Sequence, residues 1–172
     1  ESPAAPVNLC DPIDYTVKVI NVEEGNLYEV DVLVKLPQAG QVYAPGSATI
    51  TYNGVTIPLP DPAVTPDGLL WTPDFSQPPF AIEGLPGVFS APANAFEIRF
   101  QVETNCDYID GTRFFYSTAW DNACGTRHST SRFVAPELSI NGAPTASNDY
   151  QLLLQMPFPA SFCAENTVRV TA

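Results

Sequence analysis

The stretch "AFEIRFQVET", residues 95–104, decides the fold of this chain. Its apolar side chains occupy every second position: Phe96, Ile98, Phe100 and Val102. Charged or amide side chains occupy the positions between them: Glu97, Arg99, Gln101 and Glu103. A period of two is typical of a β-strand that buries one face and exposes the other. The stretch therefore predicts a strand at the surface of a layered β-structure.

The same alternation recurs along the chain and predicts an all-β fold. Apolar and polar residues alternate from Asp14 to Asn21 and from Tyr28 to Leu36, and Asn53-Gly54 is the sequence of a tight hairpin turn. Further strands are expected near 112–121, 127–134, 149–156 and 165–171. No long stretch shows the helical period of 3.6 residues. We therefore predict an immunoglobulin-like Greek-key β-sandwich.

Length and composition indicate a single domain and exclude some partners. The chain has 172 residues, enough for one core, and we expect residues 10–172 to form one domain after an extended arm at 1–9. It has 19 acidic and 7 basic residues and a net charge of -12. Nucleic acid and anionic membranes need Lys and Arg partners, so neither is an expected ligand. No apolar run reaches the ~20 residues of a membrane span, so no membrane insertion is expected.

The four cysteines indicate the setting in which the protein works. None lies in a C-x-x-C spacing and His128 is the single histidine, so a zinc site is not expected. Two disulfides, and with them an oxidising extracellular location, are the simpler interpretation. The chain has no Asn-x-Ser/Thr acceptor site, which favours a bacterial over a glycosylated eukaryotic surface protein.

Strand geometry suggests how the cysteines pair. If the strands on either side of the Asp110-Gly111 turn run antiparallel, Cys106 and Cys124 lie at opposite ends of strands about 30 Å long, too far apart for a disulfide. In an immunoglobulin-like order the first strand runs beside the strand quoted above, which brings Cys10 close to Cys106. Cys124 is then left for Cys163. A bond between Cys106 and Cys124 is the alternative.

Residues 59–94 hold much of the proline and show no sustained alternation, apart from a short strand expected at Leu69 to Trp71. A long irregular insertion of this kind is often functional. Its aromatic residues either cap the core or line a glycan- or protein-binding surface: Trp71, Phe75, Phe80 and Phe89. In the second alternative Trp71, Phe75 and Phe80 are the candidate ligand contacts.

Three kinds of chemistry have weak support or none. Asp107, Asp110 and Asp121 offer oxygen ligands for calcium, but the full calcium-loop motif is missing and an Asp-Gly turn is the simpler interpretation. The motifs of hydrolases, metalloproteases and nucleotide-binding enzymes are absent, so we expect no enzyme and no cofactor. A Lys–Asn crosslink would need Lys18 to face the core, whereas the alternation places it on the polar face.

Two parts of the sequence resemble a known family. "YTVKVIN" at 15–21 is similar to the opening strand of the conserved-repeat Ig-like domains of very large bacterial cell-surface proteins, and the later Leu-Pro with its glycine and "YAPGS" at 43–47 follow the same pattern. "FEIRFQVETNCD" at 96–107 is similar to the family's final strand and its Cys-Asp. The resemblance covers about residues 10–125, and the insertion and the segment 136–172 depart from it. It implies a modular extracellular role, structural or adhesive, and carries no catalytic residue.

We therefore expect a non-enzymatic structural or adhesive module of a bacterial surface protein or filament, at the cell surface or secreted. Its expected partners are other copies of itself or neighbouring repeats. An extended segment can add a strand to an exposed sheet edge, so the arm at 1–9 is a candidate to complete the sheet of a neighbour. Surface glycans and a host or substratum surface are further candidate partners. The alternative is a carbohydrate-binding module that uses the aromatic residues of 59–94.

Overall fold

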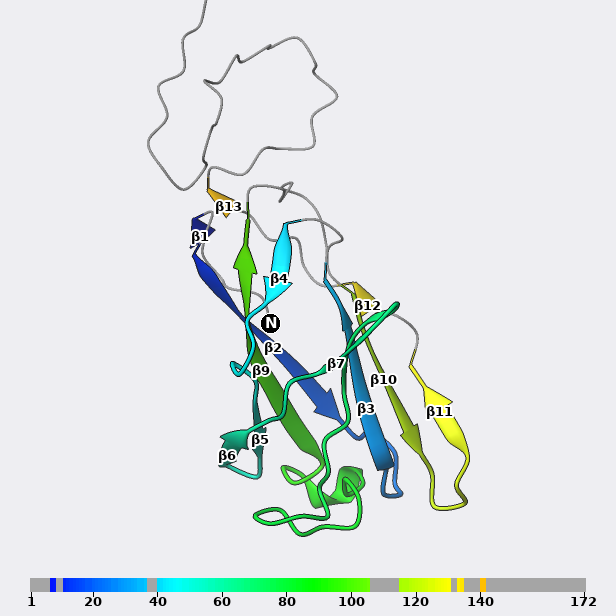
Figure 1. Ribbon diagram of the computed structural model, residues 1–172. Helices are drawn as coiled ribbons and strands as arrows, with labels where there is room; N and C mark the ends of the chain where they lie inside the picture. The colour runs from blue at the N-terminus through cyan, green and yellow to red at the C-terminus, as the bar shows by residue number, and fades with distance from the viewer. Residues whose placement is uncertain are drawn as a thin grey trace, which may run out of the picture.

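The structure is a computed structural model that describes residues 7–8, 11–36, 40–105, 115–130, 133–134 and 140–141. Within these residues the fold is all-β, and two antiparallel sheets face one another (Figure 1). The β2–β9 sheet has the order β2 (Pro12–Ile20), β9 (Ala95–Thr104), β5 (Thr49–Tyr52) and β6 (Val55–Pro58), with β4 (Gln41–Tyr43) also beside β9. The β3–β10 sheet has the order β11 (Arg127–Ser129), β10 (Phe115–Asp121), β3 (Tyr28–Lys35), β8 (Gly68–Trp71) and β7 (Ala63–Thr65), with β12 (Phe133–Val134) also beside β10. The predicted two-layer all-β architecture is thus confirmed.

The core lies between the two sheets, where the alternation of the sequence places it. β9 contributes four side chains that are at most 1% exposed: Phe96, Ile98, Phe100 and Val102. β2 contributes four that are at most 6% exposed: Ile13, Tyr15, Val17 and Val19. Burial of a large apolar side chain stabilises a fold by about 1.5–3 kcal/mol. The two strands pair antiparallel without a register shift, from Pro12 opposite Glu103 to Ile20 opposite Ala95, so the predicted pairing is confirmed.

The hairpin predicted at Asn53-Gly54 is also confirmed. Tyr52 pairs with Val55 across the turn. Asn53 has a φ of 46° and Gly54 a φ of 80°. Both residues are in the left-handed region, which Asn and Gly tolerate better than other residues.

β9 and β10 follow one another in the sequence but lie in different sheets. β10 pairs with β3, from Phe115 opposite Lys35 to Asp121 opposite Tyr28, and β9 pairs with β2, β4 and β5. The two strands therefore do not form the antiparallel pair that the sequence suggested. The turn at Asp110-Gly111 lies outside the described residues.

The segment 59–94 is less irregular than the sequence predicts. The short strand expected at Leu69 to Trp71 is present as β8, and it pairs with β3 from Leu69 opposite Val34 to Trp71 opposite Val32. β7 forms a hairpin with β8 and was not predicted. The first part of the segment thus belongs to the β3–β10 sheet. The rest, 72–94, holds the single-turn 3-10 helix η1 (Val88–Ser90) and lies at one end of the sandwich (Figure 1).

Near the other end of the sandwich, β1 (Val7–Asn8) pairs parallel with β13 (Ile140–Asn141) (Figure 1). The rest of the predicted arm at 1–9 lies outside the described residues, and so do the strands predicted at 149–156 and 165–171. The single-domain boundary at residue 10 stays a prediction. In the part of the chain that the structure describes, no helix is long and apolar enough to span a bilayer.

Candidate functional site

The aromatic residues predicted as ligand contacts lie in or against the core. Trp71 is 2% exposed and Phe75 is 6% exposed. The Trp71 ring lies 4.9 Å from that of Phe100, the Phe75 ring 5.0 Å from that of Phe96, and Phe80 packs partly buried against the same core. These are the positions of the core-capping alternative. A buried indole offers no free face to a sugar ring, so glycan binding by these residues stays a prediction without support from their position.

Asp121 is the one calcium candidate within the described residues, because Asp107 and Asp110 lie outside them. Its carboxylate accepts a 3.0 Å hydrogen bond from Arg127, so a cation of the chain itself engages it. Among the residues that the structure describes, no three His, Cys, Asp or Glu side chains gather as a metal site requires. The position of Asp121 therefore adds nothing to the calcium hypothesis.

The predicted disulfides stay predictions. Cys124 is exposed in the turn between β10 and β11, and it has no disulfide partner among the residues that the structure describes. Its predicted partner Cys163 lies outside the described residues, and so do both members of the other predicted pair, Cys10 and Cys106.

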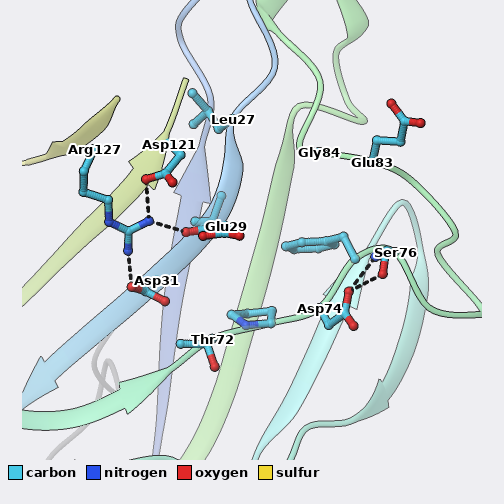
Figure 2. A pocket seen from close by; sticks show the side chains of 13 residues that line it. Leu27, Glu29, Asp31, Thr72, Asp74, Ser76, Glu83, Gly84, Asp121 and Arg127 are labelled. Carbon is cyan, nitrogen blue, oxygen red and sulfur yellow. Dashed lines mark hydrogen bonds and ion pairs between the residues drawn. The ribbon is translucent and has the colours of Figure 1, made fainter. Parts of the chain in front are cut away.

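A cavity with a volume of about 630 Å³ lies between the start of β3, the segment after β8 and the adjacent ends of β10 and β11 (Figure 2). Five carboxylates line it: Glu29, Asp31, Asp74, Glu83 and Asp121. Arg127 is the single cation among the lining residues. Four apolar residues complete much of the wall: Leu27, Val30, Pro73 and Phe75. The sequence did not predict this acidic cavity, because its walls come from four separate segments.

Arg127 joins three strands at the edge of this cavity. It lies on β11 directly opposite Asp121 of β10. Its Nη1 donates to Asp121 Oδ1 at 3.0 Å and to the backbone oxygen of Glu29 at 2.7 Å, and its Nη2 forms an ion pair with Asp31 of β3 (Figure 2). A single exposed ion pair contributes about 0.2–1 kcal/mol to stability. The Arg127 guanidinium has three acceptors, which together hold its side chain in one orientation. The contacts tie β11, β10 and β3 together.

The carboxylates on the two walls of the cavity differ in their electrostatics. Burial raises the pKa of Asp31, with Glu29 and Asp121 adding to the rise, although Arg127 acts in the opposite direction. On the other wall Asp74 accepts hydrogen bonds from the Ser76 hydroxyl at 2.6 Å and the Ser76 backbone N–H at 2.9 Å (Figure 2). These bonds lower the pKa of Asp74. With five carboxylates and one guanidinium among its lining residues, the cavity carries an excess of acidic groups, which disfavours anions.

Asn21 fixes the irregular segment to the end of β2. Its side chain is buried, and its amide donates to three backbone carbonyls: Gly25 at 2.8 Å, Leu85 at 3.1 Å and Pro86 at 2.9 Å. Its Oδ1 accepts from the backbone N–H of Glu23 at 2.9 Å. Asn94 completes the arrangement by donating from its side chain to the Asn21 backbone oxygen at 2.9 Å. Asn21 is the last residue of the motif at 15–21, so this part of the motif has a structural role.

The "YAPGS" stretch interrupts one long strand beside β9. Gln41 pairs with Thr104 in β4, whereas Thr49 pairs with Arg99 in β5, so the register shifts between them. Ser47 bridges the gap: its Oγ accepts from the Gln101 backbone N–H at 3.0 Å and takes the place of a ladder carbonyl. This motif too has a structural role.

Sequence reasoning assigned no role to Asn21, Asp61 or Arg127. The sequence does contain an indication for Asn21, because this polar residue continues the series of inward-facing positions of β2 and is buried. The indication for Arg127 is weaker: it is one of only 7 basic residues in an acidic chain. Asp61 lies between two prolines and offers no periodicity from which its contacts can be predicted.

The chain matches no protein-family model and no curated protein. Its fold is similar to that of the full-length major pilin SpaD from Corynebacterium diphtheriae, with a TM-score of 0.54 and 14% identity over 77% of this chain and 33% of that one. Two other solved structures match less well. They are a variant of BcpA, the major pilin subunit of Bacillus cereus (TM-score 0.49, 13% identity, 81% of this chain and 36% of that chain), and the pilus backbone RrgB from Streptococcus pneumoniae (TM-score 0.44, 15% identity, 68% and 26%).

At this level of identity the similarity to SpaD establishes the fold. The chain spans about a third of the length of these solved structures. The resemblance to the conserved-repeat Ig-like family stays a prediction, because no family model matches.

Proposed function

We propose that this chain is a structural module of a bacterial surface protein or filament, which acts through shape, stiffness and contacts with other subunits. The observation that carries the proposal is the similarity in fold to the major pilin SpaD over 77% of the chain. The matched part is about a third of the SpaD chain. By analogy with the major pilin SpaD, the proposed partners of this chain are other subunits of an assembly at the cell surface.

The contacts of the motif residues support a structural role. The side chains of Asn21 and Ser47 bond to backbone groups and fix loops against the two-layer core. Neither residue is among those that line the acidic cavity. The carbohydrate-binding alternative is less well supported, because Trp71 and Phe75, two of its expected sugar contacts, are buried.

Immunogold electron microscopy on intact cells of the source organism, with antibody raised against this chain, tests the proposal. We expect label on the outer surface or along filaments, and the same antibody should detect the chain in a surface-shaved fraction. Label confined to the cytoplasm of permeabilised cells would show that the proposal is wrong.

A further inference from the structure

A pocket of about 440 Å³ lies between the connection from β2 to β3 and the connection from β10 to β11. Both connections are at the end of the sandwich that also holds the segment 72–94 (Figure 1). The volume is within the ~300–1,000 Å³ of typical small-molecule sites. The residues that line the pocket include Glu23, Asn26 and Leu27 on one side and Trp120, Asn122 and His128 on the other.

Trp120 and His128 form an aromatic wall of this pocket. The two residues lie directly opposite one another on β10 and β11, and their rings stack with centroids 6.0 Å apart and planes at 21°. Trp120 is partly buried and packs against the core, whereas His128 is exposed. The core thus fixes the position of the indole, and the indole supports the imidazole. Fixed aromatic rings offer a rigid apolar surface to a ligand at little cost in conformational entropy.

Asn122 determines which nitrogen of His128 is the donor. Its Oδ1 accepts hydrogen bonds from the backbone N–H groups of Cys124 and Thr126, both at 2.9 Å. The amide nitrogen Nδ2 therefore faces His128 Nε2 at 3.2 Å, and because Nδ2 can only donate, Nε2 is the acceptor. The ring proton of the neutral imidazole is then on Nδ1. Within the described residues this N–H has no partner.

Two further polar side chains of the pocket are free to bind a ligand. The Glu23 carboxylate and the Asn26 amide have no hydrogen bond or ion pair within the residues that the structure describes. The backbone of Glu23 is nevertheless fixed, because its N–H donates to Asn21 Oδ1 at 2.9 Å and its C=O accepts from the Val88 N–H at 2.8 Å. The pocket therefore holds an open acceptor in Glu23, an open donor in His128 and an amide that can act as either.

These groups together select the chemistry of a ligand. A phosphate or carboxylate ligand has acceptors but no donor, and both Glu23 and the net charge of -12 would repel it. An ammonium ion has donors but no acceptor, so it would face the N–H of His128 as a donor against a donor. A hydroxyl group both donates and accepts. A sugar carries several hydroxyl groups on a ring whose C–H bonds can pack against an aromatic wall, so it matches the whole set.

We propose that this pocket is a carbohydrate-binding site. The ring of one sugar unit packs against Trp120 and His128, and its hydroxyl groups donate to Glu23 and accept from the Nδ1–H of His128, with Asn26 as a further partner. The site is separate from Trp71, the buried residue that was a predicted sugar contact. The proposal does not rest on the proposed function: a structural module of a surface assembly would gain an adhesive contact from this pocket.

A glycan array probed with the fluorescently labelled full chain tests the proposal. The chain is used as isolated and without reductant, so that Cys124, which also lines the pocket, keeps any bond that it forms. We expect binding to a defined group of glycans. Titration with the free sugar of the strongest array signal should then change the tryptophan emission. The chain has two tryptophans and Trp71 is buried in the core, so the change should be lost in Trp120→Phe.

Variants of the polar groups separate binding from folding. Glu23→Gln removes the charged acceptor of a sugar hydroxyl and should weaken binding about tenfold, because hydrogen bonds to charged groups are stronger than those to neutral ones. Glu24→Gln is the matched control: it makes the same change at the next residue, which is exposed and does not line the pocket, and it should leave binding unchanged. His128→Phe keeps an aromatic ring but removes the Nδ1–H donor, and it should weaken binding as well.

Thermal melting followed by circular dichroism checks that every variant folds. A folded wild-type chain that binds no glycan of the array would overturn the proposal. So would binding that persists unchanged in both Glu23→Gln and His128→Phe, because the sugar would then be held elsewhere. A change in tryptophan emission with tetramethylammonium chloride and none with any sugar would assign the pocket to ammonium groups instead.

Discussion

The Tyr43 hydroxyl donates a 2.7 Å hydrogen bond to the Asp61 carboxylate, which also accepts a 2.7 Å bond from the Gly46 backbone N–H. One carboxylate thus holds the turn after β4 against the segment before β7. Gly46 has a φ of 75°, in the left-handed region that glycine adopts without strain. The two hydrogen bonds lower the pKa of Asp61, while burial and then Asp61 itself raise the pKa of Tyr43 to about 12.

Tyr43 should therefore make the stability of the protein sensitive to alkaline pH. An unfolded tyrosine has a pKa of about 10. Between that pH and about 12 the unfolded state loses the Tyr43 proton while the folded state keeps it, so the contribution to stability is complete below pH ~10 and falls as the pH rises towards 12. Phenolate absorbance of the wild type minus that of Tyr43→Phe measures the titration directly.

Asp61→Asn should move the pKa of Tyr43 back towards its ordinary value, because an amide does not oppose the phenolate charge. Asp67→Asn removes an exposed carboxylate elsewhere and should leave the Tyr43 titration unchanged. Titration of Tyr43 near 10 in the wild type would contradict the structure at this contact.

Asn21→Ala should lower the free energy of unfolding by about 2–4 kcal/mol, because four buried or partly buried backbone groups lose a hydrogen-bond partner at once. Asn26→Ala is the matched control: Asn26 lies in the same turn with its side chain exposed, and its loss should cost less than about 0.5 kcal/mol. Urea unfolding of both variants gives the comparison. Equal stability of the two variants would mean that Asn21 does not fix the irregular segment.

Trp71→Ala should lower the free energy of unfolding by about 3–5 kcal/mol, as expected for a large aromatic side chain removed from a core. Phe89→Ala, by contrast, should change it by less than about 0.5 kcal/mol, because Phe89 is 83% exposed. Chemical denaturation measures both. A Trp71→Ala variant of wild-type stability that had lost binding on a glycan array would reverse the assignment and favour the carbohydrate-binding alternative.

Peptide mapping without reduction should recover Cys10 linked to Cys106 and Cys124 linked to Cys163. The β2–β9 ladder favours the first bond, because its last pair, Pro12 with Glu103, lies two residues after Cys10 and three before Cys106. In the chain-entropy estimate the two loops would contribute roughly 4–5 and 4 kcal/mol. A peptide linking Cys106 to Cys124, or four free thiols, would show that this pairing is wrong.

A strand was predictable from the sequence where one of its faces is buried and the other is exposed to solvent. β9 and β2 meet that condition, so a period of two appears in both. β10 was located too, but every one of its residues is only partly buried, and its alternation did not reveal that it pairs with β3. Sheet membership depends on contacts far apart in the sequence, which a local period does not record.

The acidic cavity and its Arg127 contacts were not predictable in the same way. Arg127 Nη1 reaches the backbone oxygen of Glu29, 98 positions away. No local pattern encodes such a contact. The aromatic residues of 59–94 were found by composition, but composition alone does not separate a side chain that caps a core from one that faces a ligand. The burial of Trp71 follows from its position on β8, whose place in the β3–β10 sheet required the structure.

The pairing of β2 with β9 also determines when β2 can join its sheet during synthesis of the chain. Its paired positions are 75 to 91 residues apart in the sequence, so β2 leaves the ribosome long before its neighbour exists. At roughly 5–20 residues per second this delay lasts about 4–18 s, and sheets built from such distant pairs also close slowly. For that interval a strand with four large apolar side chains has no sheet to join. This topology therefore requires that β2 be kept from aggregation until β9 has been synthesised.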